Sequence, residues 1–226
     1  MSRDGGGFDR LAGGYRVLEF LAFGRALEEA RFCLLDRLGD RRAILVLGEG
    51  DGRGLVRLLE AAPAGAVTCV DLSAAMLDRA RARLQEADLG RVRFVQADLL
   101  VDPLPDGPFD AVVTCFVLDC FTPEQAGALV RSVAARLEPG ARWLWADFRI
   151  PARGPLRWRA RAWVALLYAF FRWQTGLPAR ALPPSEDLIA AAGLAPVEGR
   201  DFQAGLVRSV LFSRPASGPG PVPPAQ

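Results

Sequence analysis

Short apolar runs alternate with helical patterns along the middle of the chain, and this alternation constrains the fold more than any other feature. Five of these runs have the length and composition of buried strands. They cover residues 43–47, 66–70, 92–95, 109–115 and 141–146. Strands that alternate with helices in this way predict an α/β fold, in which an open parallel sheet carries helices on both faces.

The last part of the chain departs from this alternation. Residues 196–202 and 206–213 are two strand-like runs separated by Gln203-Ala204-Gly205. A short connection that contains glycine predicts an antiparallel hairpin. Joined to the five parallel strands, the hairpin completes a mostly parallel sheet of seven strands.

Helical patterns fill the connections between the strands. An apolar pattern over residues 15–38 predicts a helical entry that Gly24 splits in two. Thr122-Pro123-Glu124-Gln125 is a capping box with proline at the first helical position, and its helix is expected to run to Leu137. Further helices are predicted over residues 55–62, from Ser73 onward, and from a cap at Ser185 to near Gly193.

Composition limits the chemistry of this chain. Its 226 residues suit one domain, and 28 basic against 26 acidic side chains argue against an electrostatically driven nucleic-acid binder. There is no histidine, and every basic residue is arginine. Catalysis by a lysine or histidine base is therefore excluded, and so is a histidine metal ligand, so we expect no metal.

The cysteines and the apolar runs indicate the compartment. Four cysteines without a Cys-x-x-Cys pair are too few for a disulfide scaffold, so we expect a cytoplasmic protein. The longest fully apolar run, residues 163–171, is much shorter than the roughly 20 residues that span a bilayer.

The sharpest local feature is a glycine-rich turn between the first strand and its helix. Gly48, Gly50 and Gly52 permit a tight turn and let a ligand approach the backbone. Asp71 ends the second strand and is placed to accept both hydroxyls of a ribose, while Asp98 follows the third strand and is placed to accept from an adenine amino group. Together they predict a nucleoside site at the carboxyl edge of the sheet.

Two nucleoside ligands fit such a site. The dinucleotide fingerprint requires G-x-G-x-x-G, but Arg53 stands at the third glycine position counted from Gly48. The spacing is G-x-G-x-G instead, which suits a nucleoside without a pyrophosphate.

The chain resembles the class I S-adenosylmethionine-dependent methyltransferases. The resemblance extends from Phe8 to Arg214, and it is carried by the glycine turn, Val70-Asp71-Leu72-Ser73 with Met76, Gln96-Ala97-Asp98, Phe109-Asp110-Ala111-Val112-Val113 and Leu137-Glu138-Pro139-Gly140. The segment Phe8-Asp9-Arg10-Leu11-Ala12 with Tyr15 is similar to the entry segment of the quinone-biosynthesis branch. The resemblance implies a Rossmann-like fold, S-adenosylmethionine as cofactor and S-adenosylhomocysteine as product.

The resemblance also assigns roles to the residues of the crevice. Gly48, Gly50 and Gly52 border the methionine end, and Asp71 holds the ribose. Around the adenine and beneath the reacting methyl group it places Leu72, Met76, Asp98, Leu99, Cys115 and Phe116. The family's acidic residue two positions before the first glycine is replaced here by Val46, so Glu49 either compensates for it or is a solvent-exposed loop acid.

Candidates for a general base are the two acids that follow strands four and five. Asp119 is either a base or the cap of a turn, and Asp147 is either a base or the partner of Arg149. Cys120 is more plausible as a buried thiol than as a nucleophile. Tyr15 either contacts the substrate or packs as an ordinary aromatic residue.

An aromatic and basic segment lies between strand five and the last helix. Residues 153–173 contain Trp163 and Phe170 among other aromatic residues and several arginines. The segment either walls a pocket for the acceptor together with Arg149, packs as a core or dimer helix, or contacts a membrane surface peripherally. Monomer and homodimer both remain open.

The expected organisation is one methyltransferase domain over residues 8–214. It includes a helical entry segment (8–40) and a helical cap insertion (149–184), between disordered ends at 1–7 and 215–226. The function expected is methyl transfer to a small, apolar or aromatic acceptor by in-line displacement. A non-methylating S-adenosylmethionine-binding protein and a nicotinamide-dependent oxidoreductase are the alternatives.

Overall fold

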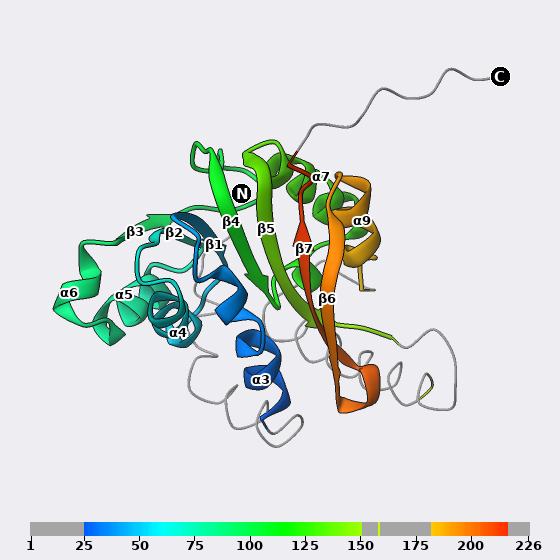
Figure 1. Ribbon diagram of the computed structural model, residues 1–226, viewed down its shortest axis with the longest axis horizontal. Coiled ribbons are helices and arrows are strands. Elements are labelled where there is room, and N and C mark those ends of the chain that lie inside the picture. The colour runs from blue at the N-terminus through cyan, green and yellow to red at the C-terminus, as the bar shows by residue number, and fades with distance from the viewer. Residues whose placement is uncertain (1–24, 151–157, 159–181, 217–226) are drawn as a thin grey trace.

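The computed structural model describes residues 25–150, 158 and 182–216, and these form a seven-stranded sheet in the order β3-β2-β1-β4-β5-β7-β6 (Figure 1). The strands are β1 (Ala43–Leu47), β2 (Ala66–Asp71), β3 (Val92–Gln96), β4 (Phe109–Cys115), β5 (Leu137–Phe148), β6 (Ala195–Phe202) and β7 (Val207–Ser213). Strand β7 pairs antiparallel with both β5 and β6, and the other pairs are parallel. This confirms the predicted fold, including the terminal hairpin.

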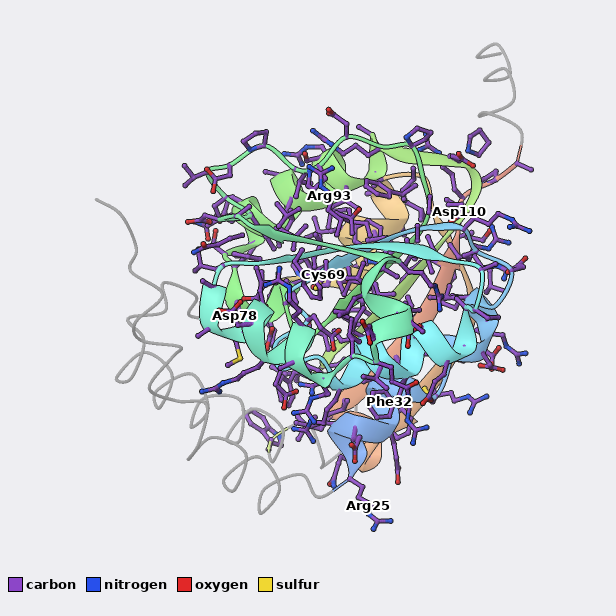
Figure 2. The ribbon with its side chains drawn as sticks, turned by 90° about the vertical axis from the view of Figure 1, so that its left-hand side faces the viewer. Arg25, Phe32, Cys69, Asp78, Arg93 and Asp110 are labelled. Atoms are coloured by element: carbon purple, nitrogen blue, oxygen red, sulfur yellow. The ribbon has the colours of Figure 1, made fainter. Side chains whose placement is uncertain are left out.

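Helices cover both faces of the sheet. They are α3 (Ala26–Phe32), α4 (Arg53–Ala61), α5 (Ala74–Arg83), α6 (Glu86–Leu89), α7 (Pro123–Ala134) and α9 (Ser185–Ala191), with 3-10 turns η1 (Leu35–Leu38), η2 (Leu118–Cys120) and η3 (Gln203–Gly205). One apolar core lies between the sheet and α7 with α9, and the other lies between the sheet and η1, α4 and α5. Figure 2 shows Phe32 of α3 and Asp78 of α5 on the same side of the sheet.

Strand β1 shows how the sequence divides between these cores. Leu45 and Leu47 pack into the α7 side, while Ile44 and Val46 pack into the α4 side. All four side chains are buried. Successive side chains of a strand point to opposite faces, so a central strand covered on both sides must be apolar throughout.

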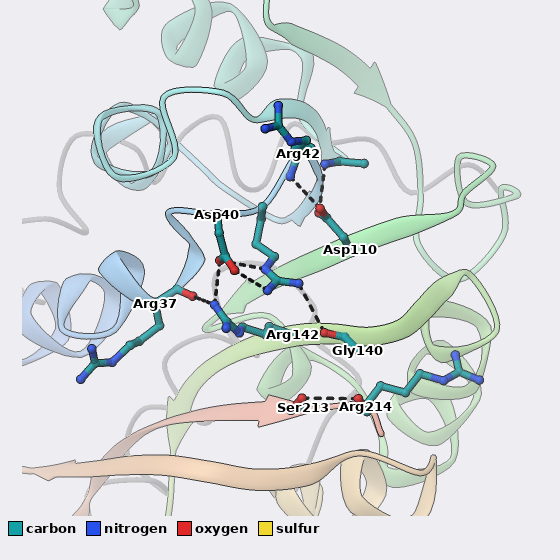
Figure 3. A network of polar contacts seen from close by, with 10 residues as sticks. Arg37, Asp40, Arg42, Asp110, Gly140, Arg142, Ser213 and Arg214 are labelled. Atoms are coloured by element: carbon teal, nitrogen blue, oxygen red, sulfur yellow. Dashed lines mark hydrogen bonds and ion pairs between the residues drawn. The ribbon is translucent and has the colours of Figure 1, made fainter. Parts of the chain in front are cut away.

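The amino-terminal ends of the central strands are tied together by polar contacts (Figure 3). Asp110 accepts hydrogen bonds from the backbone N–H groups of Arg42 and Ala43, at 2.7 and 2.9 Å. Arg142 donates to Asp40 and to the carbonyl of Arg37. Asp110, part of the motif that suggested the family, is therefore a structural residue at the edge opposite the crevice.

Two predicted helix boundaries and the predicted start of the fifth strand are wrong. Helix α7 ends at Ala134 rather than Leu137, because Leu137 already pairs with Phe109 and begins β5. Gly140, in its left-handed conformation (φ +80°), lies inside that strand. Ser185 is the first residue of α9 and makes no cap, since Pro184 holds the cap position.

The entry helix also differs from the prediction. Within the described residues, α3 ends at Phe32 and the chain continues as the 3-10 turn η1. The predicted split at Gly24 lies outside the described residues, as do 1–7, nearly all of the 149–184 insertion and most of 215–226. In the described part of the chain, no helix is long and apolar enough to cross a membrane.

Candidate cofactor and active site

The predicted site residues converge at the carboxyl edge of the parallel strands. The glycine turn follows β1, Asp71 ends β2, Asp98 follows β3 and Cys115 ends β4. Asp147 lies one residue before the end of β5. Ligands of open α/β sheets bind in the crevice outside these ends, so the topology brings the candidates into one site.

All three glycines of the turn have left-handed backbone conformations, with φ of +63°, +74° and +87° for Gly48, Gly50 and Gly52. A Cβ atom on Gly48 would lie 2.5 Å from Val117 Cγ2, and one on Gly52 would lie 2.5 Å from Ala80 Cα. A Cβ atom on Gly50 would meet nothing within 4 Å. The outer glycines therefore let the turn pack closely, and Gly50 leaves its backbone open to a ligand.

Asp71 ties the first two loops of the crevice together. Its Oδ2 accepts from the N–H of Gly50 at 3.1 Å, and its Oδ1 accepts from the N–H of Ser73 at 2.9 Å. Ser73 in turn caps α5 by accepting from the N–H of Met76 at 3.2 Å. These two bonds fix the Asp71 carboxylate between the glycine turn and the start of α5.

The predicted adenine pocket lies on the loops after β2 and β3. These loops are neighbours because Asp71 pairs with Gln96 in the parallel register, and Gln96 Nε2 donates to the carbonyl of Leu72 at 3.3 Å. Asp98 accepts from the N–H of Leu100 at 2.9 Å. Met76 is half-buried, and Leu99 packs against the α7-side core.

Glu49 is half-buried, and its side chain folds back onto the start of α4. Its Oε1 accepts from the N–H of Leu55 at 2.7 Å, at the amino end of α4, where the cap residue Gly52 has no side chain to do this. Burial raises the pKa of Glu49 to about 7. The alternative of a solvent-exposed loop acid is therefore wrong.

A small cavity of about 20 Å³ lies beneath the glycine turn. Its lining includes Arg31 from α3, Val46 and Glu49 around the turn, and Cys115 at the end of β4. Burial raises the pKa of the Cys115 thiol to about 12, so this sulfur is neutral and contributes no charge.

Asp119 and Asp147 form a buried acidic pair. The N–H of Asp119 donates to Asp147 Oδ2 at 3.1 Å, and the N–H of Phe148 donates to Asp147 Oδ1 at 2.9 Å. Asp147 is 1% exposed, whereas Asp119 is half-buried. Burial raises the pKa of Asp119 to about 6, and burial and the neighbouring Asp119 charge raise the pKa of Asp147. Near neutral pH the pair therefore tends to hold a proton.

The structural alternative for Asp147, an ion pair with Arg149, is wrong. Arg149 lies 3.8 Å from Glu186 and 3.7 Å from Asp201, which places its ion pairs on α9 and β6 instead of on Asp147. Cys120 donates to Asp119 Oδ1 at 3.6 Å, and burial raises the pKa of its thiol. A neutral thiol is a poor nucleophile, which supports the buried-thiol alternative.

Phe116 has an unusual conformation directly after β4. Its φ is +58°, a left-handed value that is rare for an aromatic residue. The Arg31 guanidinium lies 5.0 Å from the centre of its ring, and the Phe148 ring contacts it edge-on at 5.3 Å. These contacts from α3 and β5 hold the ring at the crevice.

Comparison with known proteins indicates the family to which this chain belongs. A family model described as a methyltransferase domain matches residues 44–140. A demethylmenaquinone methyltransferase from Thermus thermophilus is 36% identical over 153 residues, which are 65% of this chain and 66% of that protein. An uncharacterized methyltransferase from Mycobacterium bovis is 30% identical over 146 residues, which are 63% of this chain and 71% of that protein.

The chain belongs to the class I S-adenosylmethionine-dependent methyltransferases.

The fold of this methyltransferase also has solved counterparts. The structure of an O-methyltransferase family protein from Burkholderia thailandensis superposes with a TM-score of 0.69 at 19% identity, over 96% of this chain and 60% of that one. The chain thus spans just under two thirds of the Thermus relative and 60% of the Burkholderia chain.

The residues present fit the cofactor of this family. Gly50 has open space beside its backbone, and its N–H holds the Asp71 carboxylate next to the turn. Leu72, Met76 and Leu99 supply apolar side chains near the predicted adenine. The cofactor roles of these residues stay predictions.

Three predicted substrate residues lie outside the described residues: Tyr15, Trp163 and Phe170. Sequence reasoning missed two others that the fold brings to the site. Val117 packs on Gly48, and Arg31 reaches Phe116 and the cavity. No sequence pattern links Arg31 to residues more than eighty positions away, because only the docking of α3 brings them together.

Proposed function

We propose that this protein transfers a methyl group from S-adenosylmethionine to a small hydroxylated aromatic acceptor by in-line displacement. The observation that carries this proposal is the Asp119–Asp147 pair at the carboxyl ends of β4 and β5. The segment that holds Asp119 also carries Val117, which packs against Gly48 of the glycine turn. A proton acceptor and the cofactor loop are therefore adjacent.

These positions indicate which part of the reaction the cofactor supplies and which part the two acids perform. When bound, the sulfonium cofactor supplies an electrophilic methyl group, so the chain needs only to align the acceptor, exclude water and take up a proton. Half-buried Asp119 is the member of the pair that meets the acceptor. It takes the hydroxyl proton, while Asp147 positions it through the bond from its N–H.

An aromatic acceptor is supported by the relatives and by the composition of the cap. The Thermus relative, which is 36% identical, is named for demethylmenaquinone. Tyr15, Trp163 and Phe170 are proposed to wall the acceptor pocket, with Arg149 at its rim. Peripheral membrane contact through residues 153–173 is consistent with an apolar acceptor and stays a proposal, as does a monomeric or homodimeric state.

Calorimetry with S-adenosylmethionine, S-adenosylhomocysteine and NAD tests the cofactor. We expect both sulfur nucleosides to bind and NAD to remain unbound, because the turn lacks the dinucleotide spacing. Binding of NAD alone would overturn the proposal in favour of the oxidoreductase alternative.

Transfer of a labelled methyl group to a panel of quinols, phenols, thiols and amines tests the acceptor. We expect label in the quinols or phenols, and Asp119→Asn should lower the rate by about 10²–10⁴-fold, the usual contribution of a general base. Asp78→Asn, a charge change on the outside of α5, is the matched control and should leave the rate unchanged. Tight cofactor binding with no transfer to any acceptor would favour the non-methylating alternative.

A further inference from the structure

Strand β5 carries a buried indole N–H close to the acidic pair. Its residue, Trp145, is 2% exposed, and no described residue accepts a hydrogen bond from the indole nitrogen. A buried donor without an acceptor is costly, and native interiors contain few of them. The position of this N–H therefore calls for a physical reason.

A second tryptophan on the same strand has an indole N–H that is satisfied. Trp143 Nε1 donates to Thr114 Oγ1 of β4 at 2.8 Å, and both side chains are buried. Trp143 and Trp145 belong to the same core, on the α7 side of the sheet. The two rings thus share a strand, a face and a degree of burial, and they differ in whether the N–H has an acceptor.

The side chain that follows Trp145 on this face of β5 is Asp147. Residues two positions apart on a strand point to the same face, and Asp147 is as deeply buried as the tryptophan. Its Oδ1 and Oδ2 accept from the backbone N–H groups of Phe148 and Asp119. An ionised carboxylate can accept further hydrogen bonds, whereas a protonated one has less acceptor capacity.

Within the described residues, no arginine forms an ion pair with Asp147. Arg208 is its direct cross-strand neighbour on β7, but the guanidinium pairs with Glu186 at 3.1 Å and with Asp201 at 2.9 Å. Arg149, two residues further along the chain, pairs with the same two acids. Acids of α9 and β6 therefore hold both arginines.

The titratable groups on the β4 side of Asp147 supply no positive charge either. Asp119 and Cys120 approach it from η2, and Cys115 ends the neighbouring strand. Burial raises the pKa of both thiols, so they stay neutral. Burial and the Asp119 charge raise the pKa of Asp147, while the N–H donors around it, the Trp145 indole among them, lower it. An ionised Asp147 therefore depends on N–H donors rather than on cations.

We infer that Trp145 is a positioning residue of the acidic pair, whose indole N–H donates to the Asp147 carboxylate when Asp147 ionises. The inference rests on the proposed function for its catalytic meaning, since the pair is the proposed proton acceptor. The N–H lies outside hydrogen-bond geometry in this structure and gains its acceptor when Asp147 takes up the charge. Trp145 thereby lowers the pH at which the pair releases its second proton.

The test measures ionisation in the unliganded protein, with Trp143→Phe as the matched control. NMR follows the carboxyl resonances of isotopically labelled aspartate, and the Asp147 resonance is the one that Asp147→Asn removes. Trp145→Phe should raise the apparent pKa of Asp147, lowering its ionisation constant about tenfold, as expected when one hydrogen bond to a charged group is lost. Trp143→Phe removes a buried N–H that bonds Thr114 and should leave this titration unchanged.

A second measurement uses the unaltered protein and does not depend on the folding of a variant. The Trp145 indole N–H resonance should move downfield as Asp147 ionises, with the same midpoint, because the proton enters a charge-assisted hydrogen bond. The Trp143 indole resonance should not follow that titration. In Asp147→Asn the movement of the Trp145 resonance should be lost.

The methyl-transfer assay gives the catalytic counterpart. Trp145→Phe should move the apparent pKa in the pH profile of kcat upward and leave KM for S-adenosylmethionine unchanged, because the indole acts on the proton acceptor and not on cofactor binding. Trp143→Phe should leave both the profile and KM unchanged.

The outcomes separate this inference from the proposed function. An Asp147 titration that Trp145→Phe leaves unchanged overturns the inference, and so does a Trp145 indole resonance that ignores the ionisation of Asp147. Equal shifts from Trp143→Phe and Trp145→Phe also overturn it, because they indicate a general loosening of the core. If both NMR titrations give the expected result but no acceptor is methylated, the role of Trp145 toward Asp147 stands and the proposed function fails.

Discussion

At the scale of single residues, Gly48, Gly50 and Gly52 of the glycine turn share a left-handed backbone conformation. Their surroundings differ, so a side chain would be unfavourable for different reasons. Gly48 and Gly52 are closely approached by Val117 and Ala80, while Gly50 faces open space. The left-handed backbone makes any other residue unfavourable at each position, but only the outer two also exclude a Cβ atom sterically.

We predict that Gly52→Ala lowers the free energy of unfolding by about 2–4 kcal/mol, from the left-handed strain together with the contact to Ala80 backbone. Gly50→Ala, with the strain alone, should cost about 1–2 kcal/mol. Urea unfolding of both variants measures the difference. Equal costs would show that the contact with α5 relaxes.

The acidic residues of the site predict a dependence of stability on pH. Asp119, Asp147 and Glu49 all have pKa values raised by burial, so the native state binds protons that the unfolded chain has lost. Their stabilisation is complete below about pH 4 and declines as the pH rises through the raised values. The free energy of unfolding should therefore fall between pH 5 and pH 8.

Urea unfolding across this range provides the measurement, with two variants to divide the effect. Glu49→Gln should remove the part of the slope near pH 7, and Asp147→Asn should remove the part that belongs to the acidic pair. Unfolding free energies that rise with pH in the parent protein would contradict the raised pKa values.

At the scale of elements, the start of α7 is the clearest case of local determination. The Thr122 hydroxyl accepts from the N–H of Gln125 at 3.3 Å, and the Gln125 side chain accepts from the N–H of Thr122 at 3.0 Å. Proline occupies the first helical position, as predicted. The cap depends on contacts within four residues, which is why the sequence pattern located it.

We predict that Thr122→Ala lowers the free energy of unfolding by about 1 kcal/mol, the usual cost of a lost N-cap. Thr122→Ser keeps the hydroxyl and should change the free energy of unfolding by only a few tenths of a kcal/mol. Thermal or urea unfolding measures both, and a serine variant as unstable as the alanine variant would assign the effect to the lost methyl group instead.

The carboxyl end of α7, unlike its start, does not depend on local contacts alone and was not predictable from the sequence pattern. The helical pattern continues to Leu137, but the backbone leaves the helix after Ala134 because Leu137 pairs with Phe109 of β4. That pairing joins residues far apart in sequence and competes with the local preference. The predicted end of α7 is therefore wrong because strand pairing, not local preference, decides it.

At the scale of the whole molecule, β7 links the C-terminal part of the chain to the rest. It lies between β5 and β6, and its Phe212 and Val210 enter the same core as β1 and α7. The last strands thus belong to one cooperative unit with the first. We expect the described sheet to unfold in a single transition.

We predict that Phe212→Ala lowers the free energy of unfolding by about 3–5 kcal/mol, because the ring is almost fully buried in that core. Val197→Ala on β6, where the side chain is 65% exposed, should stay within about 0.5 kcal/mol. Circular dichroism and fluorescence should report coincident transitions for the parent protein. Separate transitions would show that the hairpin unfolds on its own.

The sequence by itself determined the strands, the hairpin, the glycine turn and the placement of Asp71, Asp98, Asp119 and Asp147 at strand ends. These depend on periodicity and turn chemistry, which act over a few residues. Only the tertiary structure decided that Glu49 folds back onto the start of α4, that Asp119 contacts Asp147, and that Arg31 reaches Phe116. Such contacts join separate elements, and their energies depend on packing and burial that exist only once the sheet and its helices have assembled.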